Sequence, residues 1–272
     1  MEWRLLDTET NDAYYNMAVD EAVMEAHRAG LVPPTIRFYQ WSPPGLSLGY
    51  FQQIQETVDK EVCKENKIDI VRRLTGGRAI LHDDELTYSI VISEKLAYLP
   101  KSILESYKII SKGIISALRF LGLGVELKEV DNNRKAPKGF SSACFDAPSW
   151  YEVVIEDKKL VGSAQTRKDG IILQHGSIPF SINADSLYNV LKIPSEKVRE
   201  RLKKRFLKQA TALNWETASK LTYKQLKDAL IAGWENEFEI KLKPAHLSEK
   251  EIELVENLIR NKYRTDDWNG KR

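Results

Sequence analysis

The chain has 272 residues, of which 42% are hydrophobic and 29% are charged, and its formal net charge is +2 at pH 7. This is the composition of an ordinary globular protein, long enough for one sizeable α+β domain or for a domain with a short appendage. A charge this near zero does not indicate nucleic-acid binding. No apolar run approaches the roughly 20 residues that span a bilayer, and the start of the chain lacks a signal-peptide hydrophobic region. We therefore expect a cytoplasmic protein with no nucleic-acid or membrane partner.

The number and spacing of the cysteines and histidines exclude disulfide-rich proteins and zinc-binding proteins. The two cysteines, Cys63 and Cys144, are too few for a disulfide framework and are typical of a reducing compartment. The four histidines have no cysteine or histidine partner at the spacing of metal ligands. We expect no metal site and no cofactor.

The first third of the chain predicts a helix followed by short strands. Residues 11–30 have a helical pattern, with Asp12 as N-cap and Gly30 at the end. Strands are expected at 35–39 and 46–50, a helical stretch at 58–66, and a clearly alternating strand at 86–92.

A second helix is predicted at residues 102–121. Ser102 and Glu105 have the spacing of a capping box, apolar residues recur on one face, and Gly122 terminates the pattern. A strand at 125–130 and a polar, basic loop at 131–139 follow.

Residues 141–177 hold the chemically most informative pattern. Cys144 lies between a run of small residues and a turn, and a strand-like segment follows at 151–156. A tight connection then leads into a second short strand at 159–164. Such a hairpin can bring Lys159 beside the base of the loop that holds Cys144. An ammonium group near a thiol favours the thiolate, which is the nucleophile.

The last third predicts mainly helices. Helices are expected at 184–191 and 195–206, the second with Lys or Arg at nearly every exposed position. Two further capping boxes, Thr222 with Gln225 and Ser248 with Glu251, each begin a helix. We predict a catalytic domain at 1–214 and a small, mainly helical C-terminal extension at 215–272. Without regular β-α alternation, the fold class is α+β.

Several plain interpretations stay open at the level of single residues. Gly76-Gly77, between arginines, can approach a phosphate or carboxylate ligand or form a simple turn, and the spacing fits neither a Walker loop nor a dinucleotide fingerprint. His82 can be structural, Cys144 an inert buried thiol, and Lys159 a solvated hairpin lysine. Cys63, in an amphipathic segment, is expected to be structural.

Several motifs resemble the lipoate-protein ligase and octanoyltransferase family, whose relatives include biotin protein ligases. The segment RRLTGGRAILH at 72–82 resembles its signature, KLVGSA at 159–164 its lysine motif, and NMA with DE at 16–21 its first helix. The stretch SACFDAPSWYE at 142–152 resembles the cysteine-dependent octanoyltransferase branch, usually called LipM, and the ending around Trp268-Asn269 is also similar. The likeness covers nearly the whole chain.

The resemblance implies a fold and an activity. The implied fold has mixed, mostly antiparallel sheets flanked by helices, with the acyl chain in a tunnel. The implied reaction moves octanoyl from acyl carrier protein to a specific lysine of a lipoyl-domain protein, such as the glycine cleavage H protein, through a thioester on the enzyme. Cys144 is then the nucleophile and Lys159 the residue that tunes it. The other implied site residues are Arg73, Thr75, Gly76, Gly77, His82, Gly162, Ser163 and Ala164.

Three other functions compete with this one. An ATP-dependent lipoate or octanoate ligase has the same fold but no need of Cys144. An amidotransferase would move the acyl group between lipoyl domains. A non-catalytic acyl-binding protein would keep the pocket alone, which the joint presence of Cys144 and Lys159 disfavours. Two basic patches, at 134–138 and on the helix that starts at Ser195, are candidate surfaces for acidic carrier domains.

Overall fold

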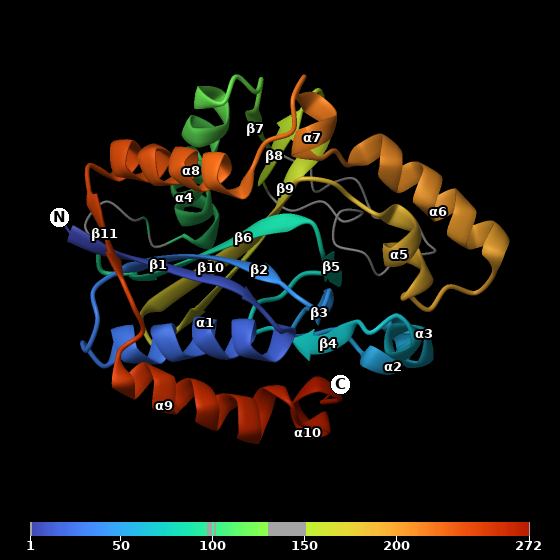
Figure 1. The fold of residues 1–272 in the computed structure, drawn as a ribbon, viewed down its shortest axis with the longest axis horizontal. Coiled ribbons are helices and arrows are strands. Elements are labelled where there is room, and N and C mark those ends of the chain that lie inside the picture. Colours follow the sequence, from blue (N-terminus) through green and yellow to red (C-terminus); the bar gives the residue numbers. More distant parts are fainter. Residues whose placement is uncertain (1, 97–99, 101, 130–150, 272) are drawn as a thin grey trace.

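A computed structural model describes residues 2–96, 100, 102–129 and 151–271, and Figure 1 draws their fold. In these residues the main sheet has eight strands, in the order β11 (Lys241–Ala245), β1 (Glu2–Asn11), β2 (Thr35–Trp41), β6 (Glu85–Ser93), β10 (Ile171–Pro179), β9 (Lys158–Lys168), β8 (Tyr151–Ile155) and β7 (Glu126–Glu129). Strand β1 pairs in parallel with β11 and β2, and the other pairs are antiparallel. The predicted α+β fold with a mixed, mostly antiparallel sheet is confirmed.

A smaller sheet carries the glycine-containing segment that the sequence singled out. In the described chain it has three strands, in the order β4 (Asp69–Arg72), β3 (Gly45–Leu48) and β5 (Ile80–His82). Two short helices, α2 (Ile54–Thr57) and α3 (Lys60–Glu65), connect β3 to β4. The segment between β4 and β5 therefore crosses the end of this sheet before the chain enters the main sheet at β6.

One face of the main sheet is covered by α1 (Ala13–Arg28), with α9 (Glu249–Leu258) against it (Figure 1). Helix α1 begins where Asp12 accepts a hydrogen bond from the backbone N–H of Tyr15, at 2.7 Å. It ends two residues before Gly30, whose φ of +72° suits glycine. A turn at Ile259–Tyr263 and the short helix α10 (Asp266–Asn269) close the chain.

The other face is covered by α4 (Ile103–Phe120) and α8 (Tyr223–Phe238), which cross closely. A Cβ atom added to Gly113 would lie 2.0 Å from Cδ1 of Trp234, and one added to Gly233 would lie 2.3 Å from the Gly113 carbonyl oxygen. Trp234 is fully buried, and its indole N–H donates to the Ile110 carbonyl at 3.1 Å. Two glycines thus let one tryptophan anchor α8 on α4.

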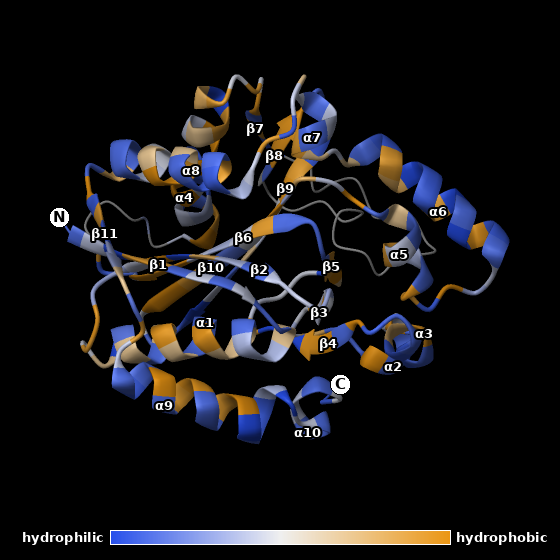
Figure 2. Cartoon of the chain, viewed as in Figure 1, coloured by the Kyte–Doolittle hydropathy of each residue, from blue (hydrophilic) through white to orange (hydrophobic). Residues whose placement is uncertain are grey.

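Three further helices follow β10 in the chain. They are α5 (Ala184–Asn189), α6 (Glu196–Gln209) and α7 (Leu213–Glu216). Helix α6 buries Leu202 and Phe206, while most of its length is coloured hydrophilic in Figure 2. None of the helices among the described residues is long and apolar enough to cross a membrane.

Some local predictions are confirmed and others were incomplete. The predicted capping boxes at the starts of α8 and α9 are both present, whereas at α4 the bond found is from the Glu105 N–H to the Ser102 hydroxyl, at 3.5 Å. No strand was predicted at β1, β10 or β11. Strand β11 lies in the segment predicted as mainly helical, and it gains its partner only because β1 lies beside it. The predicted basic loop at 131–139 and Cys144 lie outside the described residues.

Residues 215–272 pack against the rest of the chain throughout. Helix α8 covers the sheet, β11 extends it, and α9 lies on α1. The Arg4 guanidinium makes a buried, bidentate ion pair with Glu251, with N–O distances of 2.5 and 2.8 Å. The division into two units at residue 214 stays a prediction.

The crossing of α4 and α8 makes a testable prediction. Alanine is the better helix former, so Gly113→Ala should stabilise α4 if only helix propensity mattered. Because the new methyl group would overlap the Trp234 ring, we expect the free energy of unfolding to fall instead, by about 1–3 kcal/mol. Urea unfolding measures it, with Lys112→Ala at the adjacent exposed position as control. A Gly113→Ala protein at least as stable as the parent would contradict the packing argument.

Candidate active site

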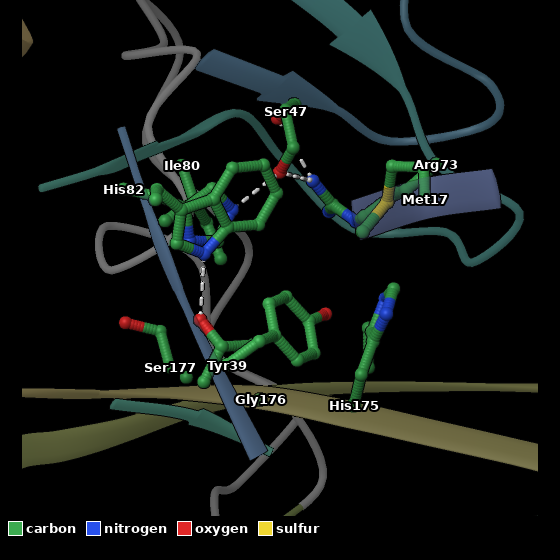
Figure 3. Close-up of a pocket in the computed structure, with 13 residues that line it drawn as sticks. Met17, Tyr39, Ser47, Arg73, Ile80, His82, His175, Gly176 and Ser177 are labelled. Carbon is green, nitrogen blue, oxygen red and sulfur yellow. Dashed lines mark hydrogen bonds between the residues drawn. The ribbon is translucent and has the colours of Figure 1, made fainter. Parts of the chain in front are cut away.

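A small cavity lies where the small sheet meets strands β9 and β10, with about 290 Å³ of empty space that includes part of the open solvent. Its walls come from seven elements that are far apart in the sequence, and Figure 3 shows their side chains. The lining residues are Met17, Tyr39, Trp41, Ser47, Arg73, Ile80, His82, Thr87, Gly162, Ala164, His175, Gly176 and Ser177. The lining combines apolar and aromatic side chains with two buried histidines and one buried arginine.

The first histidine, His82, belongs to a chain of hydrogen bonds that ends on a carboxylate. Its Nε2 lies 2.8 Å from the Ser47 hydroxyl and its Nδ1 lies 2.8 Å from Glu85 Oε1. The Trp41 indole stacks on the imidazole, with ring centroids 4.0 Å apart. Because the Glu85 carboxylate can only accept, His82 Nδ1 carries a proton and donates it to Glu85 Oε1.

The second histidine, His175, repeats this arrangement. Its Nε2 lies 2.7 Å from the Thr75 hydroxyl and its Nδ1 lies 2.9 Å from Asp20 Oδ2. Asp20 is held in turn by the Arg37 guanidinium at 2.8 Å and the Tyr39 hydroxyl at 3.1 Å. The site therefore contains two hydroxyl–imidazole–carboxylate chains.

Arg73 joins the two chains. Its Nε donates to the Thr75 hydroxyl at 3.1 Å, and one terminal nitrogen donates to the Ser47 hydroxyl at 3.0 Å and the Ser47 carbonyl at 2.9 Å. Figure 3 shows the Ser47 hydroxyl between the guanidinium and the His82 ring. The other terminal nitrogen donates to the carbonyls of Gly76 and Arg78, each at 2.8 Å. Through the hydroxyls of Ser47 and Thr75, both imidazoles are therefore connected to the guanidinium of Arg73.

The same guanidinium shapes the glycine loop. Gly77 has a φ of +92°, and a Cβ atom on it would lie 2.9 Å from a terminal nitrogen of Arg73. A Cβ atom on Gly49 would lie 2.0 Å from the Gly77 carbonyl oxygen. The loop can close over Arg73 and against β3 only where these side chains are absent.

Arg72 is held by the end of the chain. Its guanidinium donates to the carbonyls of Gly49, Tyr50 and Gln52 and to those of Trp268 and Asn269. The Asn269 side chain accepts from the Arg72 backbone N–H at 2.8 Å, and the Trp268 indole donates to the Arg72 carbonyl at 2.9 Å. Helix α10 thus fixes the start of the site loop, which no local pattern in the sequence indicated.

Burial and hydrogen bonding set the charges in the site. Burial opposes ionisation of Asp20, but the hydrogen bond from His175 and the charge of Arg37 outweigh it and lower its pKa. Burial opposes ionisation of Glu85 too, and His82, Ser177 and Thr87 together lower its pKa. Burial lowers the pKa of His175 despite Asp20, and Arg73 adds to this effect. The carboxylates are thus ionised and His175 is neutral.

Lys159 lies on strand β9 of the main sheet, outside the cavity lining, and pairs with a carboxylate on the neighbouring strand. Its side chain is only 4% exposed, and its ammonium lies 2.7 Å from Glu152 Oε1 on the paired strand β8. Its carbonyl accepts from the backbone N–H of Thr211 at 2.9 Å, just beyond α6. Gly162, which lines the cavity, follows three residues later on β9, about 10 Å further along the strand.

The structure brings most of the predicted site residues together. Arg73, His82, Gly162 and Ala164 line the cavity, whereas Thr75, Gly76, Gly77 and Ser163 adjoin residues of its walls and Lys159 lies further along β9. Thr75 bonds His175, Gly76 accepts from Arg73, Gly77 makes the turn, and the Ser163 hydroxyl lies 2.8 Å from the Tyr88 hydroxyl. Cys144 lies outside the described residues.

Sequence reasoning missed His175 and the role of Asp20. A single histidine inside the apolar run IILQHGSIPF was a usable signal, because an ionisable side chain in a buried strand requires a partner. Cys63 was predicted to be structural. It is fully buried, and burial raises the pKa of its thiol to about 12, which suppresses the thiolate. Within the described ranges, no cluster of His, Cys, Asp or Glu could hold a metal ion.

Comparisons with known proteins agree with this architecture. The sequence profile of the lipoyl protein ligase A/B catalytic domain matches residues 12–235. "Octanoyltransferase LipM" of Anoxybacillus flavithermus is 45% identical over 275 residues, covering 99% of this chain and 98% of the relative. Two solved structures are similar over 99% of this chain. They are a bipartite lipoate protein ligase of Thermoplasma acidophilum (TM-score 0.83, 28% identity, 96% of that chain) and a lipoate-protein ligase A bound with ATP (TM-score 0.80, 27% identity, 99% of that chain).

The lowered pKa of His175 predicts how stability depends on pH. Histidine has an ordinary pKa of about 6.5, so below that pH His175 of the unfolded chain binds a proton. Because the native His175 has a lower pKa, it does not bind that proton, and the free energy of unfolding falls as the pH falls. One such proton contributes at most about 1.4 kcal/mol per pH unit. In His175→Gln this contribution is gone, so we expect a shallower loss of stability between pH 7 and 5. Urea unfolding over that range measures it. The exposed-site control His246→Gln should keep the parent slope, and equal slopes in His175→Gln and the parent would contradict the assignment.

Proposed function

We propose a function for this chain from one premise, which is that the chain belongs to the lipoyl protein ligase A/B catalytic domain family. The protein is an octanoyltransferase of lipoate biosynthesis. It takes octanoyl from octanoyl-acyl carrier protein and delivers it to a specific lysine of a lipoyl-domain protein, such as the glycine cleavage H protein, in the cytoplasm. The observation that carries the proposal is the 45% identity, over 99% of the chain, to a relative named Octanoyltransferase LipM.

The proposed route has two steps through Cys144. The Cys144 thiolate attacks the thioester carbonyl of the donor, and the bond to the carrier sulfur breaks, releasing the carrier thiol with a proton. The neutral amine of the acceptor lysine then attacks the enzyme thioester, and the Cys144 sulfur leaves as an amide forms. The first step exchanges one thioester for another and the second runs downhill, so neither ATP nor a cofactor is needed. Two such steps give ping-pong kinetics.

Lys159 has two roles in this route. A thiol of pKa about 8.5 is only a few per cent ionised at pH 7. Lowering that pKa to about 7 gives roughly 15-fold more thiolate but costs about 5-fold in nucleophilicity, a net gain of only about 3-fold. A larger effect requires the ammonium to polarise the thioester carbonyl as well, and removing one such donor typically costs about 10²–10³ in rate.

The contacts of Lys159 support this assignment. A buried ammonium group is costly unless an anion compensates it, and Glu152 lies 2.7 Å away with only 15% of its side chain exposed. Glu152 therefore compensates the buried ammonium and holds it in one place. A solvated hairpin lysine, the plain alternative, would not be 4% exposed.

The cavity suits an acyl chain. Met17, Trp41 and Ile80 offer apolar contacts, and Gly162 and Ala164 leave room because their side chains are small. The two histidine chains keep the polar groups of the walls paired with one another, so that an apolar chain meets few unsatisfied donors.

The competing function is an ATP-dependent ligase. The similarity to a lipoate-protein ligase A bound with ATP favours it, at 27% identity. A nucleotide triphosphate needs cationic or amide donors aimed at its phosphates. Arg72 and Arg73 instead donate to hydroxyl and carbonyl oxygens of the protein itself. This pairing supports the transferase, and activity with ATP and free octanoate would support the ligase.

The covalent intermediate makes a direct prediction. Incubation with octanoyl-acyl carrier protein and no acceptor should add one octanoyl group to the enzyme, seen by intact mass, released by hydroxylamine and mapped to Cys144. Cys144→Ser should give no hydroxylamine-labile adduct, while Cys63→Ser should be acylated like the parent. An amidotransferase would instead be acylated only by an octanoylated lipoyl domain. No adduct, together with ATP-dependent transfer of free octanoate, would contradict the proposal.

The two roles of Lys159 predict a large effect of its loss. In Lys159→Ala, acylation of Cys144 by octanoyl-acyl carrier protein at pH 7 should slow by about 10²–10³, because the thioester carbonyl loses its donor. Quenched-flow mass spectrometry measures this step. Lys158→Ala, at the adjacent and less buried lysine, is the matched control and should react like the parent. A loss of only threefold in Lys159→Ala would mean that the lysine does no more than tune the thiol.

A further inference from the structure

Helix α6 carries four basic side chains on one exposed face. Lys197, Arg201, Lys204 and Lys208 are separated by four, three and four residues, the spacing of one helix face. All four are exposed, and none forms an ion pair with a residue in the described ranges. We call these four residues the cationic stripe. At 1.5 Å per residue it is about 16 Å long.

Two of the other cations of α6 have ion-pair partners. Leu202 and Phe206 are buried on the face opposite the stripe. The two cations beside that buried face have partners: Arg199 pairs with Glu196, and Lys203 pairs with Asp185 and Glu200. The ion-paired cations therefore lie on one side of the helix, and the cationic stripe, whose like charges repel one another, lies on another side. A surface with such repulsion is stabilised when an anionic partner covers it.

The stripe also concentrates the positive charge of the whole protein. Helix α6 has seven basic and two acidic side chains, a net charge of +5. Since the whole chain carries +2, the remaining residues together carry −3. The hollow along the stripe is lined by Lys197, Arg201, Lys204 and Lys208, with Arg205 and one carboxylate, Glu200. An anionic partner is thus attracted to this helix and not to the molecule in general.

The end of the stripe adjoins the candidate active site. Ala210, two residues after Lys208, forms a β-bridge with Lys159, and the next backbone N–H donates to the Lys159 carbonyl. On the buried side of α6, Phe206 lines a second cavity together with Ile80 and Ser177, which also line the first. A partner lying along the stripe would therefore have one end beside Lys159. Figure 1 shows α6 at the edge of the molecule.

We propose that the cationic stripe is the docking surface for the acyl donor, a small acidic carrier domain that bears octanoyl as a thioester. This rests on the proposed function. Long-range attraction raises the rate of encounter, and the row of charges orients the carrier so that its thioester meets Lys159. The stripe contributes to recognition of the carrier protein and not to the chemical step. Small thioesters should therefore be processed without it.

The test compares two donors and two variants. The stripe variant carries Lys197→Glu, Arg201→Glu, Lys204→Glu and Lys208→Glu, and the control variant carries the same reversal at four exposed lysines elsewhere, Lys60, Lys112, Lys220 and Lys250. For octanoyl-acyl carrier protein we expect the stripe variant to raise KM by roughly 10-fold or more with kcat unchanged. For octanoyl-pantetheine, which has no protein surface, both variants should match the parent. In the parent, added salt should raise KM for the carrier protein only.

Other outcomes would overturn the proposal. An equal rise of KM in the control variant would make the effect one of net charge, and an unchanged KM in the stripe variant would place docking elsewhere. A rise in KM for the lipoyl-domain acceptor instead would assign the stripe to the acceptor. Binding of a DNA or RNA duplex that the stripe variant abolishes, with donor kinetics intact, would assign it to nucleic acid. If the parent uses neither donor, the proposed function itself fails, a result distinct from all of these. Should the stripe variant not fold, a salt-independent KM of the parent would still overturn the docking surface.

Discussion

The guanidinium of Arg73 is the group on which the geometry of the site depends. It donates to two hydroxyls, and each hydroxyl continues through an imidazole to a buried carboxylate. One fixed positive charge thus faces Asp20 and Glu85 across two imidazoles. Because every link has a defined donor and acceptor, the loop at 73–78, strand β3 and strand β10 can hardly shift independently. The cavity is held open by polar contacts in its walls, and its apolar surface remains for a ligand.

A second, simpler charge arrangement lies on β9, three residues before Gly162 of the cavity lining. Lys159 and Glu152 form a buried pair of opposite charges on adjacent strands. Strand pairing alone places these two side chains, so the sheet that builds the cavity wall also aims the lysine. Helix α6 joins the same strand through the bridge at Ala210. The sheet, the buried lysine and the outer basic helix therefore form one continuous structure.

The order of the chain shows why distant segments had to converge. The loop that starts at Arg72 is tied to helix α10 by Trp268 and Asn269, nearly two hundred residues later. Hydrogen bonds over such a separation leave no periodic pattern in the sequence. The similarity of the ending to the family could be noticed from the residues, but its function, which is to satisfy the guanidinium of Arg72, could not. The same holds for β11, which pairs with the first strand.

The sequence by itself determined the α+β class, the long helices with their caps, the family, and four of the residues that line the cavity, Arg73, His82, Gly162 and Ala164. These are local features: helix periodicity, Ser or Thr followed three residues later by Glu or Gln, and a glycine pair between arginines. Tertiary structure alone decided that His175 and Asp20 belong to the site, that Arg73 binds the protein's own oxygens, and that Lys159 is buried against Glu152. Partners of a buried charge are chosen by proximity after folding, and proximity across strands is not written in the spacing of residues along one chain.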